Sequence, residues 1–218
     1  MLVAPCPFSL QKLIDTCCNY VSLNDMIYNT KKTVCMAFLP SVYNKIHIPN
    51  VTMGDTVLTW VETQKYLGVI ISNNYKDDKD IMRQIRSFYA RGNIIARKFN
   101  KCSPEVKVQL FKTYCSNIYA GHLWHSYSKD VMRRAKSAYN NVFSSLMSIK
   151  RGQGCSISHN FVNLGVPDFN MLVRKYINGF INRLNSSAND LVTNVINSAY
   201  FIYDSKLNAK WSEVTLQR

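Results

Sequence analysis

The hydrophobic pattern of the chain changes its period near residue 78, and this change most constrains the fold. Before it, short β-branched and aromatic runs are broken by proline, glycine and asparagine, which is typical of short strands joined by turns. After it, apolar residues recur at helical spacing, beginning with Ile81, Ile85 and Phe88. The sequence therefore predicts the α+β class, with a sheet-containing part over residues 1–73 and helices from about residue 78.

In the first part, residues 1–5 are expected to form an apolar strand that ends at the prolines. The spacing of Leu10 and Ile14 then predicts one helix, with Ser9 as its N-cap. Turns are expected over 39–54, around a short strand at 46–48. Further strands are expected over 33–38, 56–60 and 66–72.

In the second part, Asp80 is expected to cap one helix and Ser103-Pro104 to begin the next. Residues 151–154 are expected to be a basic break between helical segments at 78–150 and 155–218. The polar residues from about 204 onward are expected to fray. Further helices are expected over 129–149, 170–184 and 190–203.

The chain carries a formal net charge of +14, and nearly all of it lies in one third of the sequence. Residues 82–151 hold 14 lysines and arginines but only two acids, Glu105 and Asp130, which leaves +12. Such a local surplus of positive charge favours binding to a polyanion. Nucleic acid is the first candidate and an anionic membrane surface the second. The alternative is a basic globular protein without a specific partner.

Cysteine usage and the N-terminal residues indicate a compartment. The seven cysteines form no C-x-x-C pair, and the N-terminus lacks the pattern of a secretion signal. No run of about 18 apolar residues predicts a membrane span. We therefore expect free thiols and an intracellular protein, cytoplasmic or nuclear, that is not secreted and has no membrane partner.

Two motifs resemble a known family. Asn29-Thr30-Lys31-Lys32-Thr33 is followed by Lys65-Tyr66-Leu67-Gly68-Val69-Ile70-Ile71. The pair resembles the end of the palm in reverse transcriptases of non-LTR (LINE-type, jockey-like) retrotransposons, where an N-x-x-K-T/S segment precedes a Y-L-G primer grip. The resemblance implies that residues 1–73 are a partial palm, made of a small antiparallel sheet with one helix.

The resemblance continues along the helical part, where the order and spacing of several weak motifs make it specific. Arg91-Gly92-Asn93, Cys102 to Lys107 and Leu110 to Cys115 resemble the thumb of these enzymes. Leu123-Trp124, Ala138-Tyr139-Asn140 and the run from Phe161 to Ser186 are similar to the region that follows. Residues 78–150 are thus expected to be an all-α thumb, and residues 155–218 a helical C-terminal extension.

The family implies roles for four residues. Lys32, or its neighbour Lys31, would contact the incoming nucleotide or its pyrophosphate, and Tyr66, Leu67 and Gly68 would form the primer grip. Taken by itself, Lys32 is a surface lysine that flanks a strand. Gly68 is equally an ordinary turn glycine, and the alternative for Tyr66 and Leu67 is packing in the core.

The catalytic aspartate pair of the family should precede Met1. The chain is therefore expected to begin just after the catalytic centre of an RNA-directed DNA polymerase and to be inactive alone. Intact relatives use Mg²⁺, and no cofactor is expected in this chain.

Two clusters have the composition of a metal site. Asp77-Asp78-Lys79-Asp80 lies in a polar loop before a helix, so we interpret it as a helix start rather than a catalytic carboxylate pair. A hydrolase that uses these acids is the enzyme alternative. Cys115, His122 and His125 lack a fourth ligand and the spacing of a zinc site, so no metal site is expected.

An RNA/DNA duplex or template-primer is the expected partner, held by cations that amphipathic helices turn toward solvent. The residues expected to bind it are Arg83, Arg86, Arg97, Lys98, Lys101, Lys107 and Lys112. The alternative is a non-enzymatic nucleic-acid-binding or interaction protein. The strand predicted at 1–5 would have an open edge, which predicts self-association.

Overall fold

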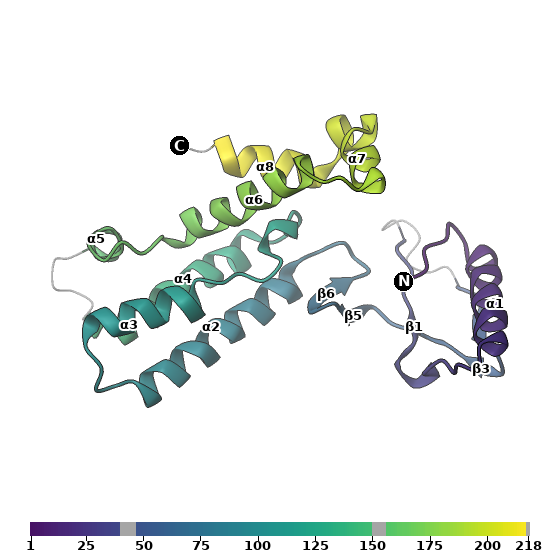
Figure 1. Ribbon diagram of the computed structural model, residues 1–218, viewed down its shortest axis with the longest axis horizontal. Coiled ribbons are helices and arrows are strands. Elements are labelled where there is room, and N and C mark those ends of the chain that lie inside the picture. The colour runs from purple at the N-terminus through teal and green to yellow at the C-terminus, as the bar shows by residue number, and fades with distance from the viewer. Residues whose placement is uncertain (40–46, 150–155, 217–218) are drawn as a thin grey trace. The chain divides into compact units, whose positions relative to one another are not determined.

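The computed structural model describes residues 1–39, 47–149 and 156–216, and the chain divides into two compact units, Met1–Tyr75 and Lys76–Arg218 (Figure 1). The fold is α+β and mostly helical, which confirms the class predicted from the sequence. The boundary falls where the hydrophobic period changes, and residues 78–150 and 155–218 belong to one unit. Residue 46 of the strand predicted at 46–48, and the break predicted at 151–154, lie outside the described residues.

The first unit contains one long helix, α1 (Pro7–Leu23). The sulfur of Cys6 accepts a hydrogen bond from the Ser9 N–H, so Cys6 is the N-cap and the prediction of Ser9 is wrong. Pro7 opens the helix because its φ is already helical and it has no N–H to satisfy. The helix buries Ile14 in a small cluster with Cys35, Val51, Met53 and Leu58.

Short strands follow α1 and pair two by two. Their bounds are β1 (Val34–Cys35), β2 (Thr52–Met53), β3 (Thr56–Val57), β4 (Thr59–Trp60), β5 (Thr63–Tyr66) and β6 (Val69–Ser72), and a 3₁₀ turn, η1 (Thr30–Lys32), precedes β1. The pairs β2–β3 and β5–β6 are antiparallel, whereas β1 and β4 are parallel. The small sheet is therefore divided into separate pairs.

The strand predicted over residues 1–5 is absent, since none of these residues pairs in a sheet. Pro5 and Pro7 lack the N–H that a strand ladder needs, and the chain enters α1 instead. The open edge predicted at these residues is therefore not formed.

The second unit is helical along its described length. Its α-helices are α2 (Asp78–Lys98), α3 (Pro104–Leu110), α4 (Lys129–Leu146), α5 (Ile157–Asn163), α6 (Phe169–Asn185), α7 (Asp190–Ile196) and α8 (Lys206–Leu216). A π-helix, η3 (Phe111–Cys115), continues α3, and a second π-helix, η5 (Tyr200–Asp204), precedes α8. Between η3 and α4 lies a 3₁₀ turn, η4 (Gly121–Leu123).

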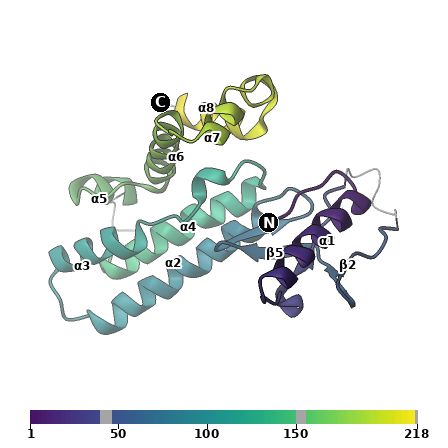
Figure 2. The same ribbon diagram turned by 45° about the vertical axis from the view of Figure 1, so that its right-hand side comes forward.

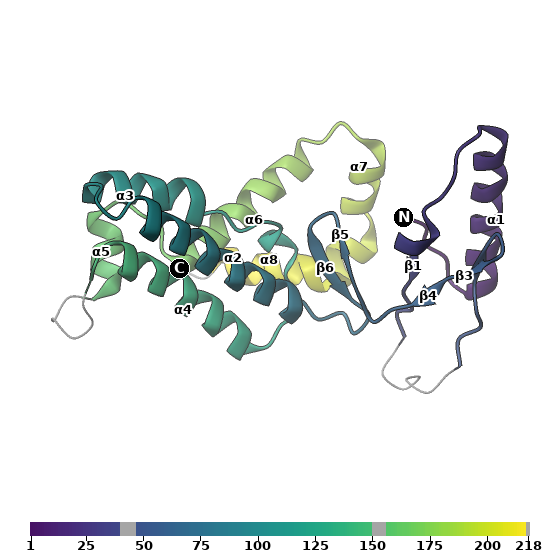
Figure 3. The same cartoon turned by 90° about the horizontal axis from the view of Figure 1, so that it is seen from below.

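The fraying predicted from residue 204 is wrong, because α8 is anchored by an aromatic residue. Its Trp211 is buried and meets the rings of Phe180 and Phe201 edge to face. Figure 3 shows α6 followed by α7, with α8 returning to pack beside α6.

The helices α2 and α4 lie side by side and run in the same direction (Figure 2). The N–H of Asp77 donates to the carbonyl of Ser126 just before both helices begin. Near the other end, a Cβ placed on Gly92 would lie 2.5 Å from Cγ1 of Val142. Glycine is therefore what allows the two helices to approach this closely.

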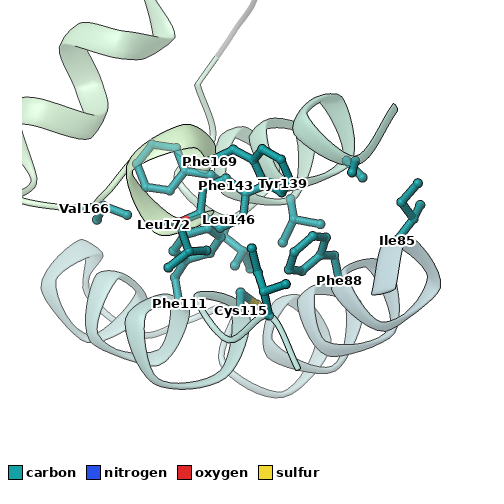
Figure 4. Close-up of a cluster of buried hydrophobic side chains, with 14 of the residues drawn as sticks. Ile85, Phe88, Phe111, Cys115, Tyr139, Phe143, Leu146, Val166, Phe169 and Leu172 are labelled. Carbon is teal, nitrogen blue, oxygen red and sulfur yellow. The ribbon is translucent and has the colours of Figure 1, made fainter. Parts of the chain in front are cut away.

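Aromatic rings from several helices meet in the core of the second unit (Figure 4). The fully buried rings are Phe88 of α2, Phe111 of η3, Tyr139 and Phe143 of α4, and Phe169 of α6. The Phe111 centroid lies 5.1 Å from those of both α4 rings, in tilted and edge-to-face arrangements. This packing fixes the rotation of α2, and so decides which of its residues face solvent.

Candidate nucleic-acid interface

The side of α2 opposite the core carries exposed cations. Ile81, Ile85 and Phe88 are buried, and at 3.6 residues per turn Arg86 and Arg97 fall on the other side, about 16 Å apart along the axis. Lys98 and Lys101 are exposed at the C-terminal end of the helix. Within residues 1–39, 47–149 and 156–216, none of these four cations forms an ion pair.

Arg83 differs from these residues because its guanidinium is engaged inside the protein. Its Nε and Nη2 donate to the buried carboxylate of Asp80 at 2.7 and 3.1 Å, and Nη2 also donates to the carbonyl of Tyr119 at 3.2 Å. The hydrogen bond to Tyr119 holds the segment after η3 against α2. Arg83 therefore has a structural role, which the sequence did not reveal.

Gln84 and Arg91 of α2 hold the same segment. The amide of Gln84 donates to the carbonyl of Asn117 at 2.9 Å, and Arg91 donates to the carbonyls of Tyr114 and Asn117. Burial lowers the pKa of Arg91, which still leaves a charged guanidinium. These bonds satisfy carbonyls that the end of η3 leaves without helical partners.

Lys107 of α3 and Lys112 of η3 are half-buried, unlike the exposed Arg86, Arg97 and Lys98 of α2. The ammonium of Lys112 lies beside Gly165, 3.7 Å from where a Cβ would stand. The structure therefore groups Arg86, Arg97 and Lys98 on α2 and places these two lysines on α3 and η3.

The outer side of α4 adds a cation that the sequence argument did not include. Asn141 donates a 3.4 Å hydrogen bond to the hydroxyl of Tyr89 across the α2–α4 seam. Arg134 precedes Asn141 by two helical turns, and Arg86 precedes Tyr89 by one turn. Arg134 and Arg86 are thus on the same side of the helix pair. The helical period of α4 was the signal that could have identified Arg134.

The residues implied for a primer grip form the tip of a hairpin. Tyr66 pairs with Val69, so Leu67 and Gly68 are a two-residue turn. Both have positive φ, 46° and 84°, as a type I′ turn requires. Leu67 is 74% exposed although leucine is strained in this conformation. The turn therefore presents a leucine to solvent instead of burying it.

Lys32 lies elsewhere in the first unit. It is exposed at the end of η1, where its N–H donates to the side chain of Asn29 at 3.2 Å. It leads into β1, which pairs with β4, whereas the Leu67 turn joins β5 to β6. Lys32 and the turn thus belong to different strand pairs.

The acids at 77–80 tie the start of α2 to the segment before α4. Asp77, not Asp80, is the N-cap residue, so the predicted helix start is confirmed and the predicted cap is wrong. The Asp77 carboxylate accepts from the N–H groups of His125 and Ser126, and Asp78 accepts from the N–H and hydroxyl of Ser128. Burial raises the pKa of Asp77, while its two backbone hydrogen bonds oppose the rise.

These carboxylates do not fit the Mg²⁺ that intact reverse transcriptases use. Asp80 is fully buried against Arg83 and the indole of Trp124. In the described part of the chain, no three acidic, histidine or cysteine side chains gather as metal ligands. We assign no metal-dependent step to these residues.

The cysteine and histidines of the rejected zinc hypothesis also have separate surroundings. Cys115 is buried in the core, and burial raises the pKa of its thiol to about 11. His122 stacks on Phe180, whereas His125 lies beside Asp77. Helix η3 ends at Cys115, so these residues do not share one helix face.

Comparison with known proteins does not assign a family. No protein family model, curated protein or solved structure matches the chain. Over the described ranges, no helix combines the length and apolar character needed to cross a membrane. The fold and its exposed cations define a mostly helical α+β protein with a basic helical surface.

Proposed function

We propose that this chain binds nucleic-acid duplexes through a basic face. The face consists of Arg86, Arg97 and Lys98 of α2, Lys101 after it, and Arg134 of α4. The observation that carries the proposal is the exposure of these cations on neighbouring helices, with none of them neutralised by an acid among the described residues.

The spacing of the cations suits a duplex backbone. Arg86 and Arg97 are about 16 Å apart along α2, which corresponds to roughly five base pairs of a duplex. Lysine and arginine bind phosphates and release condensed counterions, so affinity should fall steeply with salt. Phosphate contacts position a protein but read no bases, so little sequence preference is expected.

We also propose that the chain is part of an RNA-directed DNA polymerase of the non-LTR retrotransposon type. The order and spacing of its motifs support this proposal. In that setting the exposed Tyr66 and Leu67 contact the 3′ end of the primer, and Lys32 contacts the nucleotide or pyrophosphate. The second unit holds the duplex. The acids Asp77, Asp78 and Asp80 serve as internal hydrogen-bond acceptors, and the contribution that we propose for this chain is binding.

The second candidate is a non-enzymatic protein that binds nucleic acid through the same basic face. Photocrosslinking separates the two candidates. A primer-template with a photoreactive nucleotide at the primer 3′ end, and a second one with it inside the duplex, are crosslinked to the full chain and mapped by mass spectrometry. A polymerase part should crosslink the 3′ end to residues 66–68. Crosslinks from both probes to α2 and α4 alone would favour the second candidate.

The basic face is tested with a double variant, Arg86→Gln with Lys98→Gln. Fluorescence anisotropy of labelled RNA–DNA and DNA duplexes at several salt concentrations gives affinity and salt dependence. We expect at least a several-fold loss of affinity for both duplexes, and a slope of log affinity against log salt that flattens by about two units or less.

The matched control is Lys175→Gln with Lys206→Gln. Replacing these exposed lysines of α6 and α8 removes the same charge and leaves the basic face unchanged. If the control weakens binding as much as the test variant, net charge explains the affinity and the assignment of the face is wrong. A salt-independent binding curve would also overturn it.

A further inference from the structure

Residues 178–216 comprise the second half of α6 with α7, η5 and α8, and we call them the C-terminal segment. The main hydrophobic cluster takes Phe169 and Leu172 from the first half of α6, but its buried members include none from the C-terminal segment. The buried Trp211 of α8 packs instead against Phe180 and Phe201 within the segment. The segment is therefore joined to the rest of the unit by the continuous helix α6 and by contacts outside this cluster.

Among the described residues, His122 and Tyr127 of the loop before α4 contact the segment, and His122 makes the more extensive contact. Its ring stacks on Phe180, with centroids 4.0 Å apart and an interplanar angle of 27°. Its carbonyl accepts a 2.6 Å hydrogen bond from Nε1 of Trp211. The other contact is the ammonium of Lys210, which lies over the ring of Tyr127 at 5.3 Å.

The surroundings of His122 disfavour a positive charge. Its Nδ1 is buried and has no hydrogen-bond partner among the described residues. The charge of α6 that acts on His122 is cationic: it is the guanidinium of Arg183, which lies 5.8 Å from the centroid of the Phe180 ring. On α8, Lys210 is paired with Glu213. Burial, and then the charge of Arg183, lower the pKa of His122.

We propose that His122 is a pH-sensitive latch that holds the C-terminal segment when neutral and releases it when protonated. Because the pKa of His122 is below its ordinary value of 6.5 when the segment is held, His122 stabilises the held state at pH above 6.5. This stabilisation is lost as pH falls from 6.5 through the lowered pKa. Release would separate Phe180 from the His122 ring and break the hydrogen bond from Trp211 to the His122 carbonyl.

Hydrogen–deuterium exchange of the full chain tests the latch. Exchange is measured at pH 7.5 and 5.5, corrected for the intrinsic rate at each pH, and compared between residues 178–216 and helices α2 and α4. We expect opening of the C-terminal segment to increase several-fold at pH 5.5, and at most tenfold per pH unit because one proton is taken up. Helices α2 and α4 should keep their protection.

Two variants make the test specific. His122→Phe keeps a stacking ring but cannot titrate, so it should abolish the pH dependence. His159→Asn removes an exposed histidine of α5 and should leave the pH dependence intact. The proposal is overturned if protection of the segment is the same at both pH values, if the dependence survives in His122→Phe, or if α2 and α4 open to the same extent.

Discussion

Asp80 and Trp124 are 44 positions apart, and the indole Nε1 of Trp124 donates a 2.9 Å hydrogen bond to a carboxylate with no exposed surface. The same carboxylate accepts two hydrogen bonds from Arg83. A residue that resembles part of an acidic surface loop in the sequence is thus the centre of a buried polar network. This network connects α2 to the segment that precedes α4.

Removing the Asp80 charge should destabilise the second unit strongly. In Asp80→Asn, the Arg83 guanidinium loses its counter-charge, and we expect the free energy of unfolding to fall by about 3–5 kcal/mol. Urea denaturation measures the change. The control is Asp130→Asn, which breaks an exposed pair with Arg133 and should cost less than about 1 kcal/mol. Equal effects of the two substitutions would show that the Asp80 network is not structural.

Gly92→Ala should destabilise the α2–α4 pair despite the better helix propensity of alanine. The new Cβ would meet Val142 at 2.5 Å, and overpacking of this kind costs about 1–3 kcal/mol. Gly179→Ala in α6 meets only the flexible end of Arg183 at 3.6 Å and should stabilise the protein by about 0.5–1 kcal/mol. Thermal unfolding of both variants measures these changes in stability. A stabilising effect of Gly92→Ala would contradict the close packing of α2 and α4.

Leu67→Asn should stabilise the β5–β6 hairpin by about 1 kcal/mol, because asparagine tolerates the positive φ that strains leucine. Gly68→Ala should destabilise the hairpin, because Gly68 has a φ of 84°, which alanine adopts only with strain. Amide exchange of residues 63–72 measures both. If Leu67 contacts a primer end, the stabilised Leu67→Asn variant should also lose the 3′-end crosslink. A hairpin weakened by Leu67→Asn would argue against the type I′ turn.

Cysteine alkylation should proceed in a definite order. Hydrogen bonds from Ser9 lower the pKa of the exposed Cys6, whereas burial raises the pKa of Cys115 to about 11. Because the thiolate is the nucleophile, iodoacetamide at pH 7.5 should modify Cys6 well before Cys115. Ser9→Ala should slow the alkylation of Cys6 and leave the alkylation rate of Cys115 unchanged. Mass spectrometry of timed samples gives the order, and faster labelling of Cys115 would contradict its burial.

Local patterns in the chain were sufficient for α2 and α3 of the second unit, but not for α8, where the polar composition predicted fraying. The spacing of Ile81, Ile85 and Phe88 identified α2, and Ser103-Pro104 marked the start of α3, because both signals involve residues within a few turns of one another. The same local reasoning was wrong at Ser9 and at residues 1–5. There, neighbouring prolines and a cysteine cap determined the start of α1.

The sequence by itself determined the α+β class, the amphipathic α2 and the concentration of positive charge, since these depend on residue type and period. Only the tertiary structure decided which cations are available to a ligand. Arg83 and Arg86 are one turn apart on α2, yet the first is bound to Asp80 and the second is exposed. The difference arises because Arg83 pairs with Asp80 one turn earlier, and the Tyr119 carbonyl, which is distant in sequence, reaches Arg83 only after the chain folds.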